Sequence, residues 1–212
     1  MRVAIMQPYF LPYTGYFRLF ARSDLFILYD CVQFPRRGWV HRNRFSSDRG
    51  MLDWLTLPLA KAAQDVRIQD LQFRPSAQAD FLLQLQRFPQ LQAASAWQEA
   101  LLQFHLPPVD YLEELLKCVC NSLELPFQIQ RSSTFQLDPT LKGSERILKL
   151  CQEVGATQYI NAPGGRDLYE AEAFAQQGIT LQFLPEYQGP GVSILERLLT
   201  EPAAGIRADI VG

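Results

Sequence analysis

The sequence predicts an α/β protein built on a mainly parallel central sheet. Three observations predict it. Short apolar runs alternate with amphipathic stretches at both ends of the chain. The length of 212 residues fits one domain, and 48% hydrophobic and 20% charged residues are ordinary for a globular protein. We therefore expect a single α/β domain over residues 1–212, with helices on both faces of the sheet.

The first thirty residues have the pattern of a βαβ unit. Residues 2–6 (RVAIM) form a short apolar run that ends at Gln-Pro, which is typical of a buried strand. Thr14 is a candidate cap for a helix that reaches about Arg22. Residues 25–29 predict a second buried strand. A strand, a short helix and a strand require a parallel, right-handed crossover, which makes the sheet Rossmann-like.

The middle of the chain has an extended part followed by a helical part. Residues 40–46 and 52–59 predict a hairpin, and residues 66–73 predict a further extended segment. From 76 to 123 the apolar spacing becomes helical, and Pro89 and the Pro107–Pro108 pair divide it into three helices. We expect a helical insertion over about 76–125, lying as a cap beside the sheet.

The last third returns to strand and helix alternation. Strands are predicted at 127–131, 158–161 and 179–184. Helices are predicted at 144–154 and 166–177, and each is followed by a glycine that can end it. Beyond residue 190 only two short apolar pairs remain, and they predict no definite element. No internal repeat is present.

Composition and motifs exclude several classes of function. A net charge of −2 argues against a general nucleic-acid-binding surface, and no apolar run is long enough for a membrane span. The four cysteines form no CxxC and only two histidines accompany them, so we expect buried thiols and no metal. No dinucleotide or P-loop motif is present, and we expect no cofactor. The short N-terminal run cannot be a signal-peptide core, so we expect a cytoplasmic protein.

The loop after the first strand is the first candidate site. Loops at the carboxyl ends of parallel strands commonly bind ligands. The candidates here are Gln7, Tyr9, Tyr13 and Gly15, and the alternative is that the aromatic residues belong to the core. Tyr13-Thr14-Gly15-Tyr16 resembles in spacing the His-x-Gly-His loop of nucleotidyltransferases. The resemblance implies a shared architecture, but tyrosines replace both histidines that would stabilise a transferring phosphate.

An arginine-rich segment follows the second strand and is the second candidate site. Five arginines fall between residues 36 and 49, and guanidinium groups suit phosphates. In an alternating strand, Arg42 and Arg44 would share one face, opposite Asn43. We expect that arginine pair to bind an anion and Trp39 to stack on a sugar or base. The candidate binding residues are Gln33, Arg36, Trp39, Arg42, Asn43 and Arg44.

Three residues are candidate catalytic groups, namely Asp30, Tyr13 and His41. Asp30 stands at the carboxyl end of a predicted central strand, where we expect it to line one cleft with Gln7, Tyr13 and Arg42. The alternative is a structural carboxylate. His41 is a candidate general base, although as a strand residue it faces away from the arginine pair. Cys31 is a conceivable nucleophile.

A glycine pair near residue 164 is the third candidate site. A strand, two glycines and a helix can cradle an anion at the start of the helix. Ser144 could similarly cap a helix or bind a ligand. The candidates are Ser144, Asn161, Gly164, Gly165 and Tyr169, and the alternative is an ordinary glycine-rich turn.

Several long stretches together resemble the WbqC-like proteins of bacteria. They are MRVAIMQPYFLPYTGYFRLF, DLFILYDCVQFPRRGWVHRNRF, WLTLPL and the segment from SERILKLCQEVG to ITLQFL, within residues 1–187. The resemblance implies a role in polysaccharide or O-antigen synthesis, with aminoacyl (glycyl) transfer to an amino sugar as one such activity. The residues leave two classes of function open.

The first is a transferase acting on an amino sugar or nucleotide-sugar, and the second is a non-catalytic nucleotide-sugar binding protein. Either would bind a small anionic sugar and no nucleic acid, and these residues define no oligomeric state.

Overall fold

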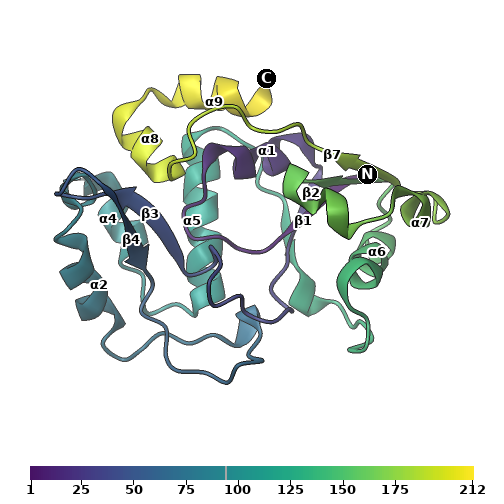
Figure 1. Ribbon diagram of the computed structural model, residues 1–212, viewed down its shortest axis with the longest axis horizontal. Coiled ribbons are helices and arrows are strands. Elements are labelled where there is room, and N and C mark those ends of the chain that lie inside the picture. The colour runs from purple at the N-terminus through teal and green to yellow at the C-terminus, as the bar shows by residue number, and fades with distance from the viewer. Residues whose placement is uncertain (94) are drawn as a thin grey trace.

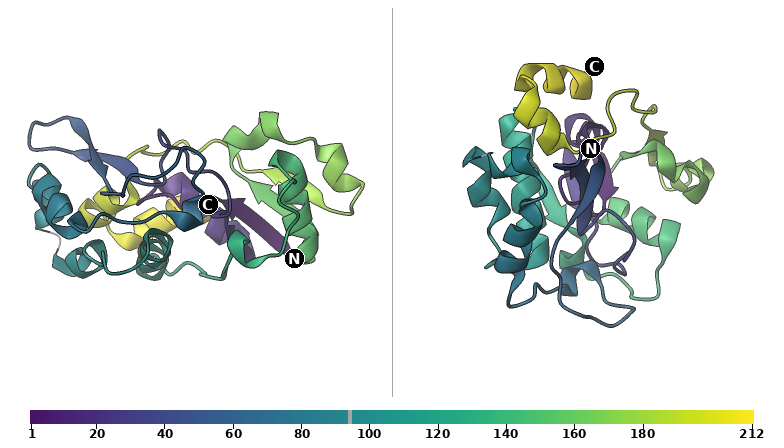
Figure 2. Two further views of the ribbon diagram at one scale, coloured as in Figure 1. Left: turned by 90° about the horizontal axis from the view of Figure 1, so that it is seen from below. Right: turned by 60° about the vertical axis from the view of Figure 1, so that its left-hand side comes forward.

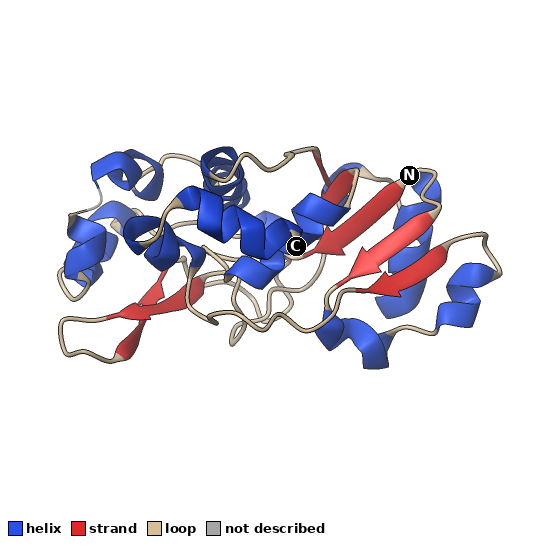
Figure 3. Cartoon of the chain, turned by 90° about the horizontal axis from the view of Figure 1, so that it is seen from above, coloured by secondary structure: helices blue, strands red, loops and turns tan. Residues whose placement is uncertain are grey.

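A five-stranded parallel sheet forms the centre of the computed structural model, which describes residues 1–93 and 95–212 (Figures 1 and 3). Position 94, within the predicted helical stretch, lies outside the described residues. The sheet strands are β1 (Arg2–Met6), β2 (Leu25–Leu28), β5 (Ile129–Arg131), β6 (Gln158–Asn161) and β7 (Thr180–Phe183). Their order is β5-β2-β1-β6-β7, and every neighbouring pair is parallel. Counted along the chain this is a Rossmann-like 3-2-1-4-5 order, so the predicted α/β fold class is confirmed.

The remaining elements are a hairpin and the helices. The hairpin consists of β3 (Arg42–Ser46) and β4 (Leu52–Thr56). The α-helices are α1 (Thr14–Arg22), α2 (Ala77–Leu85), α3 (Pro89–Gln92), α4 (Ser95–Leu101), α5 (Pro108–Ser122), α6 (Gly143–Glu153), α7 (Ala171–Ala175), α8 (Ile194–Thr200) and α9 (Ala203–Val211). Three 3₁₀ turns are η1 (Ile68–Asp70), η2 (Ser132–Thr134) and η3 (Pro163–Leu168).

Alternating side chains of the strands serve two separate cores. On one face, Ala4, Phe26 and Leu28 are buried in a cluster with residues of α1, α5, α8 and α9. On the other face, Val3 and Ile5 are buried with residues of α6 and α7. Strand side chains point alternately to opposite faces, so these near-continuous apolar runs fit a sheet covered on both sides. Each fully buried Val, Leu, Ile or Phe side chain contributes about 1.5–3 kcal/mol.

The stretch expected as a helical insertion has two structural roles. Helices α2 to α4 lie beside the β3–β4 hairpin, at the left of Figure 1, and Phe45 of β3 meets Phe88 with ring centroids 6.1 Å apart. Helix α5 directly precedes β5 and is the crossover helix that returns the chain from the hairpin to the sheet. Prolines occupy the first turns of α3 and α5, where a missing N–H costs nothing.

Three expectations about elements were wrong. Residues 66–73, expected as one extended segment, are interrupted by the η1 turn, and isolated bridges at Arg67 and Phe73 are their only β-pairing within the described residues. The helix predicted at 166–177 is divided into η3 and the short α7. Beyond residue 190 the chain forms α8 and α9, which lie against α1 (Figures 1 and 2). Only Ile206 and Ile210 of α9 are buried, so its sequence carries little periodic signal.

Candidate functional site

A cleft of about 770 Å³ opens at the carboxyl edge of the sheet. Strand β1 has β2 on one side and β6 on the other, so successive chain connections leave it in opposite directions. Such a switch point leaves a crevice between the two diverging loops. All neighbouring strands are parallel, and the arrows visible in Figure 3 point to the same edge of the sheet. Loops after β1, β2, β6 and β7 contribute to the cleft. Its volume is in the range of small-molecule sites.

Many of the predicted binding residues meet in this cleft. Those that line it are Gln7, Tyr9, Tyr13, Trp39, Asn43, Arg44, Asn161, Gly164, Gly165 and Tyr169. They come from the β1–α1 loop, the hairpin and the segment after β6, which are far apart in the sequence. The topology of the sheet brings them together, as expected for loops at one edge.

Tyrosines form much of the wall that follows β1. The rings of Tyr9 and Tyr16 lie 5.5 Å apart, and the Tyr16 hydroxyl donates a 2.8 Å hydrogen bond to the Gln7 carbonyl. Burial, followed by the charge of Glu186, raises the pKa of Tyr13. Tyr13 therefore keeps its proton at neutral pH, and its hydroxyl has a hydrogen to donate.

Gly15 fixes the position of the Tyr13 ring. A Cβ atom at Gly15 would overlap the Tyr13 ring and would stand 2.9 Å from the Tyr187 Cβ. The two tyrosine rings, 5.9 Å apart, pack together over this glycine. Gly15 was predicted to contact a ligand, but it is buried and does not line the cleft. Its role in the structure is to let Tyr13 fold back.

The segment after β6 forms the opposite side of the cleft. A Cβ atom at Gly165 would overlap the Asn161 side chain, so only glycine allows this close approach. Asn161 accepts a 2.8 Å hydrogen bond from the Ala162 N–H. The anion cradle was expected at the start of a helix, but the segment that follows the strand is the six-residue 3₁₀ turn η3. So short a turn carries little of the macrodipole that a full helix has.

The hairpin contributes one buried amide and one exposed guanidinium. The Asn43 amide donates hydrogen bonds to the carbonyls of Leu11 (2.6 Å) and Phe10 (3.2 Å), which holds the β1–α1 loop against the hairpin. Arg44 points to the other face, and its guanidinium lies 5.7 Å from both the Trp39 and Trp54 rings. The predicted alternation along this strand is present, with Asn43 buried between two arginines.

The structure does not place Asp30 in the cleft. Only 1% of this residue is exposed, and its carboxylate is absent from the cleft lining. The carboxylate accepts hydrogen bonds from Ser132 Oγ (2.9 Å), Ser133 N (2.9 Å) and Ser133 Oγ (2.7 Å). The expectation that Asp30 opens toward Gln7 and Tyr13 is therefore corrected, because the start of η2 takes up its oxygens.

His41 and Arg42 also lie outside the cleft lining. His41 packs edge-on against Phe34 at 4.9 Å, and burial lowers its pKa to about 4, with the charge of Arg42 adding to the effect. Arg42 stacks on Trp54 at 4.2 Å and donates a 2.9 Å hydrogen bond to the Arg37 carbonyl. The expected cleft partnership of Arg42 with Gln7 and Tyr13 is thus corrected, because the indole and a main-chain carbonyl hold its guanidinium.

Four further candidate residues lie outside the cleft lining. Gln33 donates to the Gln64 carbonyl, and Arg36 donates to the carbonyls of residues 62 and 63. Ser144 lies in the first turn of α6 and does not line the cleft. The thiol of Cys31, the conceivable nucleophile, lies 3.4 Å from an Arg146 nitrogen, also outside the lining.

Sequence reasoning missed several residues that line the cleft. Tyr29 and Glu186 are the most informative of them, and Tyr16, Leu168 and Gly191 are others. Tyr29 immediately follows β2, and Glu186 follows β7 by three residues. The rule that led to Gln7, that polar residues after parallel strands face the cleft, would have found Glu186 after the strand predicted at 179–184. Tyr29 was placed inside the strand predicted at 25–29, so the rule did not reach it.

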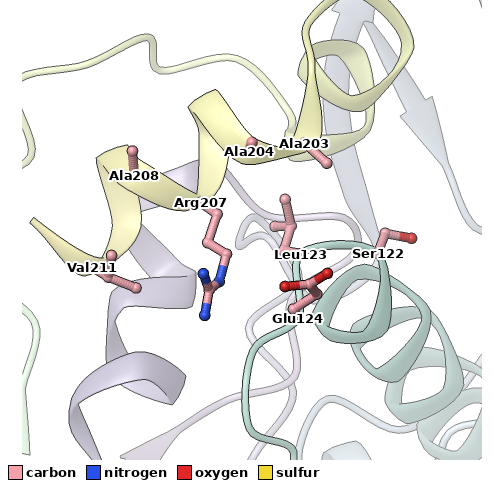
Figure 4. A pocket seen from close by; sticks show the side chains of 8 residues that line it. All are labelled: Ser122, Leu123, Glu124, Ala203, Ala204, Arg207, Ala208 and Val211. Carbon is pink, nitrogen blue, oxygen red and sulfur yellow. The ribbon is translucent and has the colours of Figure 1, made fainter.

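A smaller crevice of about 270 Å³ lies between α9 and the end of α5. Figure 4 shows the side chains of Arg207 and Glu124 extending between these two helices. Small alanine side chains form much of the α9 side. No residue predicted to bind a ligand lies there.

The fold and the cleft define an α/β protein with a candidate ligand site at the switch point of a parallel sheet. The chain belongs to the WbqC-like protein family, whose sequence profile matches residues 7–191, and the resemblance seen in the sequence is confirmed. It is 29% identical over 223 residues to a protein of Mycobacterium tuberculosis (strain ATCC 25618 / H37Rv) named "Uncharacterized protein Rv1507c". That match covers 93% of this chain and 92% of that protein. No solved structure matches the chain. Within the described residues, no helix is long and apolar enough to cross a membrane.

Proposed function

We propose that this protein binds an anionic sugar, such as a nucleotide-sugar, and acts on it as a transferase in bacterial surface polysaccharide synthesis. The observation that carries the proposal is the composition of the cleft. Tyrosine and tryptophan rings line about 770 Å³ of space together with the guanidinium of Arg44. Aromatic rings pack on the apolar faces of sugars, and a guanidinium binds phosphate through charge-assisted hydrogen bonds.

Each wall of the cleft has a part in this proposal. Arg44 binds the phosphates, and Trp39, which is 39% exposed, stacks on the base or the first sugar. Tyr9 and Tyr13 bind the sugar ring, with Gln7 and Asn161 as amide partners for its hydroxyl groups. The role in polysaccharide and O-antigen synthesis that the family resemblance implies supports the choice of substrate class.

Within this proposal the reaction is acyl or aminoacyl (glycyl) transfer to an amino sugar. The amine nitrogen attacks the carbonyl carbon of an activated aminoacyl ester or thioester, an amide bond forms, and the alcohol or thiol leaves with a proton. Tyr13 is the proposed catalytic residue, because it lines the cleft with its hydroxyl protonated. It donates a hydrogen bond to the oxygen that gains negative charge.

A second candidate function is a non-catalytic nucleotide-sugar binding protein on the same scaffold. One observation favours it. Asp30 and His41, two of the three residues predicted to be catalytic, lie outside the cleft lining. A binding protein needs the aromatic walls and Arg44 but no proton acceptor.

Calorimetric titration of the full chain with UDP-, dTDP- and GDP-linked sugars tests the binding. The expected result is micromolar binding of at least one of them. Mass spectrometry after incubation with a nucleotide-linked amino sugar and activated glycyl donors then tests the transfer through the amide product. Binding without product supports the binding protein, whereas no binding of any sugar in the panel overturns the proposed function.

A further inference from the structure

The cleft contains one negative and one positive side chain. Among its lining residues in the described ranges 1–93 and 95–212, Glu186 is the only carboxylate and Arg44 is the only guanidinium or ammonium. Glu186 comes from the segment after β7, and Arg44 comes from the hairpin. The other polar lining groups are amides, hydroxyls and an indole. The cleft is therefore neutral overall but carries both charges.

Neither charge is engaged by the protein. Within the described residues, the Glu186 carboxylate has no hydrogen bond or ion pair, and the Arg44 guanidinium has only the two indole rings as partners. Some other charges of the protein are paired, as Arg87 and Asp53 are at 2.6 Å. Two unpaired opposite charges in one cleft are available to a ligand.

The segment that bears Glu186 is held in place. Arg18 of α1 donates a 2.8 Å hydrogen bond to the Pro185 carbonyl, immediately before Glu186. The next residue, Tyr187, packs against Tyr13 and accepts a 3.0 Å hydrogen bond from Arg197. Glu186 is exposed, but the chain on either side is fixed to α1 and α8. Its backbone is therefore positioned before a ligand arrives, which reduces the entropy lost on binding.

We infer that Glu186 binds a cationic group of the ligand, so that the cleft selects a sugar carrying a free ammonium as well as a phosphate. This inference rests on the proposed function and names the substrate class within it. Arg44 takes the phosphate and Glu186 takes the ammonium. A neutral hydroxyl in place of the ammonium leaves the carboxylate without its charge-assisted partner.

The experiment compares matched nucleotide-sugars by calorimetry. UDP-sugars with a free amine at carbon 2, 3 or 4 are each paired with the sugar that has a hydroxyl at that carbon. The wild type is expected to bind at least one amino sugar about tenfold more tightly than its partner, the ratio that one charge-assisted contact supports. Glu186→Gln is expected to remove this preference and leave the affinity for the hydroxyl sugar unchanged. Glu124→Gln, which changes an exposed carboxylate in the other crevice, is the matched control.

A second arm uses free sugars without a nucleotide. Saturation-transfer NMR with millimolar glucosamine and glucose is expected to show contact of the wild type with glucosamine alone, and Glu186→Gln is expected to lose it. UDP-sugars that bind without any amine preference, or a preference that persists in Glu186→Gln, overturn this inference but leave the proposed function standing. If no UDP-, dTDP- or GDP-linked sugar binds, the proposed function fails, and the glucosamine arm still supports or overturns the role of Glu186.

Discussion

The carboxylate of Asp30 and the hydroxyl of Ser133 are joined by a 2.7 Å hydrogen bond, and the Ser133 N–H binds the same carboxylate at 2.9 Å. Ser133 lies in η2, directly after β5, and Asp30 lies two residues beyond the end of β2. The pair therefore joins the ends of two neighbouring strands beside the cleft without entering it. An acidic residue at the carboxyl end of a strand has a structural role here.

Asp30→Ala is expected to destabilise the fold and to leave ligand affinity nearly unchanged. The change leaves buried Ser132 and the Ser133 N–H without their acceptor, which costs about 1–3 kcal/mol. Urea denaturation measures the free energy of unfolding, and calorimetry measures nucleotide-sugar affinity. Asp48→Ala, at an exposed position, is the control and should change neither. A stable Asp30→Ala protein that has lost its ligand would contradict the structural role.

Arg44→Ala and Arg42→Ala should separate ligand binding from stability. Arg44 lines the cleft, so its loss is expected to weaken nucleotide-sugar binding by about 10- to 100-fold, the range for a charge-assisted contact. Arg42→Ala is expected to change the affinity for the nucleotide-sugar less than about threefold. Its loss should instead lower the free energy of unfolding by about 0.5–2 kcal/mol, because it removes the guanidinium stacked on Trp54. The reverse pattern, measured by calorimetry and thermal melts, would assign the anion contact to Arg42.

Arg197→Met is expected to lower both stability and ligand affinity. Only 4% of Arg197 is exposed, and its guanidinium binds Glu201, Asp209, the Thr14 hydroxyl and the Tyr187 hydroxyl. Loss of these charge-assisted bonds should cost about 1.5–3 kcal/mol of unfolding free energy. Because Tyr187 packs on Tyr13, the cleft wall should also loosen, which calorimetry would record as weaker binding.

The matched control for that experiment is Arg207→Met. Arg207 lies on α9, is exposed, and has no ion pair within the described part of the chain. The Arg207→Met variant should have the melting temperature of the wild type. Equal affinity of Arg197→Met and wild type for a nucleotide-sugar would remove Arg197 from any role in positioning the tyrosine wall.

His41 should make the folded state sensitive to mild acid. Burial lowers its pKa from the usual 6.5 to about 4 in the folded protein. Between these two values the unfolded chain binds a proton that the folded chain does not. The contribution of His41 to stability is therefore complete above pH 6.5 and is lost as the pH falls from 6.5 toward 4.

Denaturant unfolding at pH 7 and pH 5 measures this effect. Relative to His41→Gln, the wild type is expected to lose about 1 kcal/mol more on acidification, an amount that allows for solvent screening of a partly buried group. His105→Gln removes the other histidine, which is exposed, and should keep the wild-type difference. An identical pH response of His41→Gln and wild type would show that His41 titrates normally when folded.

The alternation of apolar runs was enough to predict the parallel sheet. Strand residues such as Val3, Ile5 and Phe26 are buried on the two faces of the sheet. Burial of both faces requires consecutive apolar residues, and such runs can be recognised in the sequence. Helix α9 is different, because only Ile206 and Ile210 face the core, and its contacts are made across the whole chain. Residues 66–73 have the pattern of an extended segment, but within the described residues they form only isolated bridges. Pairing depends on neighbouring strands, which the local pattern does not reveal.

The sequence by itself determined that Gln7 and Asn161 stand at strand ends, and parallel strands present those ends at one edge. Tertiary structure alone decided which side chains are free to bind. Asp30 and Arg42 have the same chemistry as Glu186 and Arg44. Ser133 holds Asp30, and the Arg37 carbonyl together with the close Trp54 ring holds Arg42, whereas Glu186 and Arg44 line the cleft. Hydrogen bonding and stacking depend on neighbours that are up to about a hundred residues distant in the chain. The residue types are local information, whereas the availability of their charges is set by the folded structure.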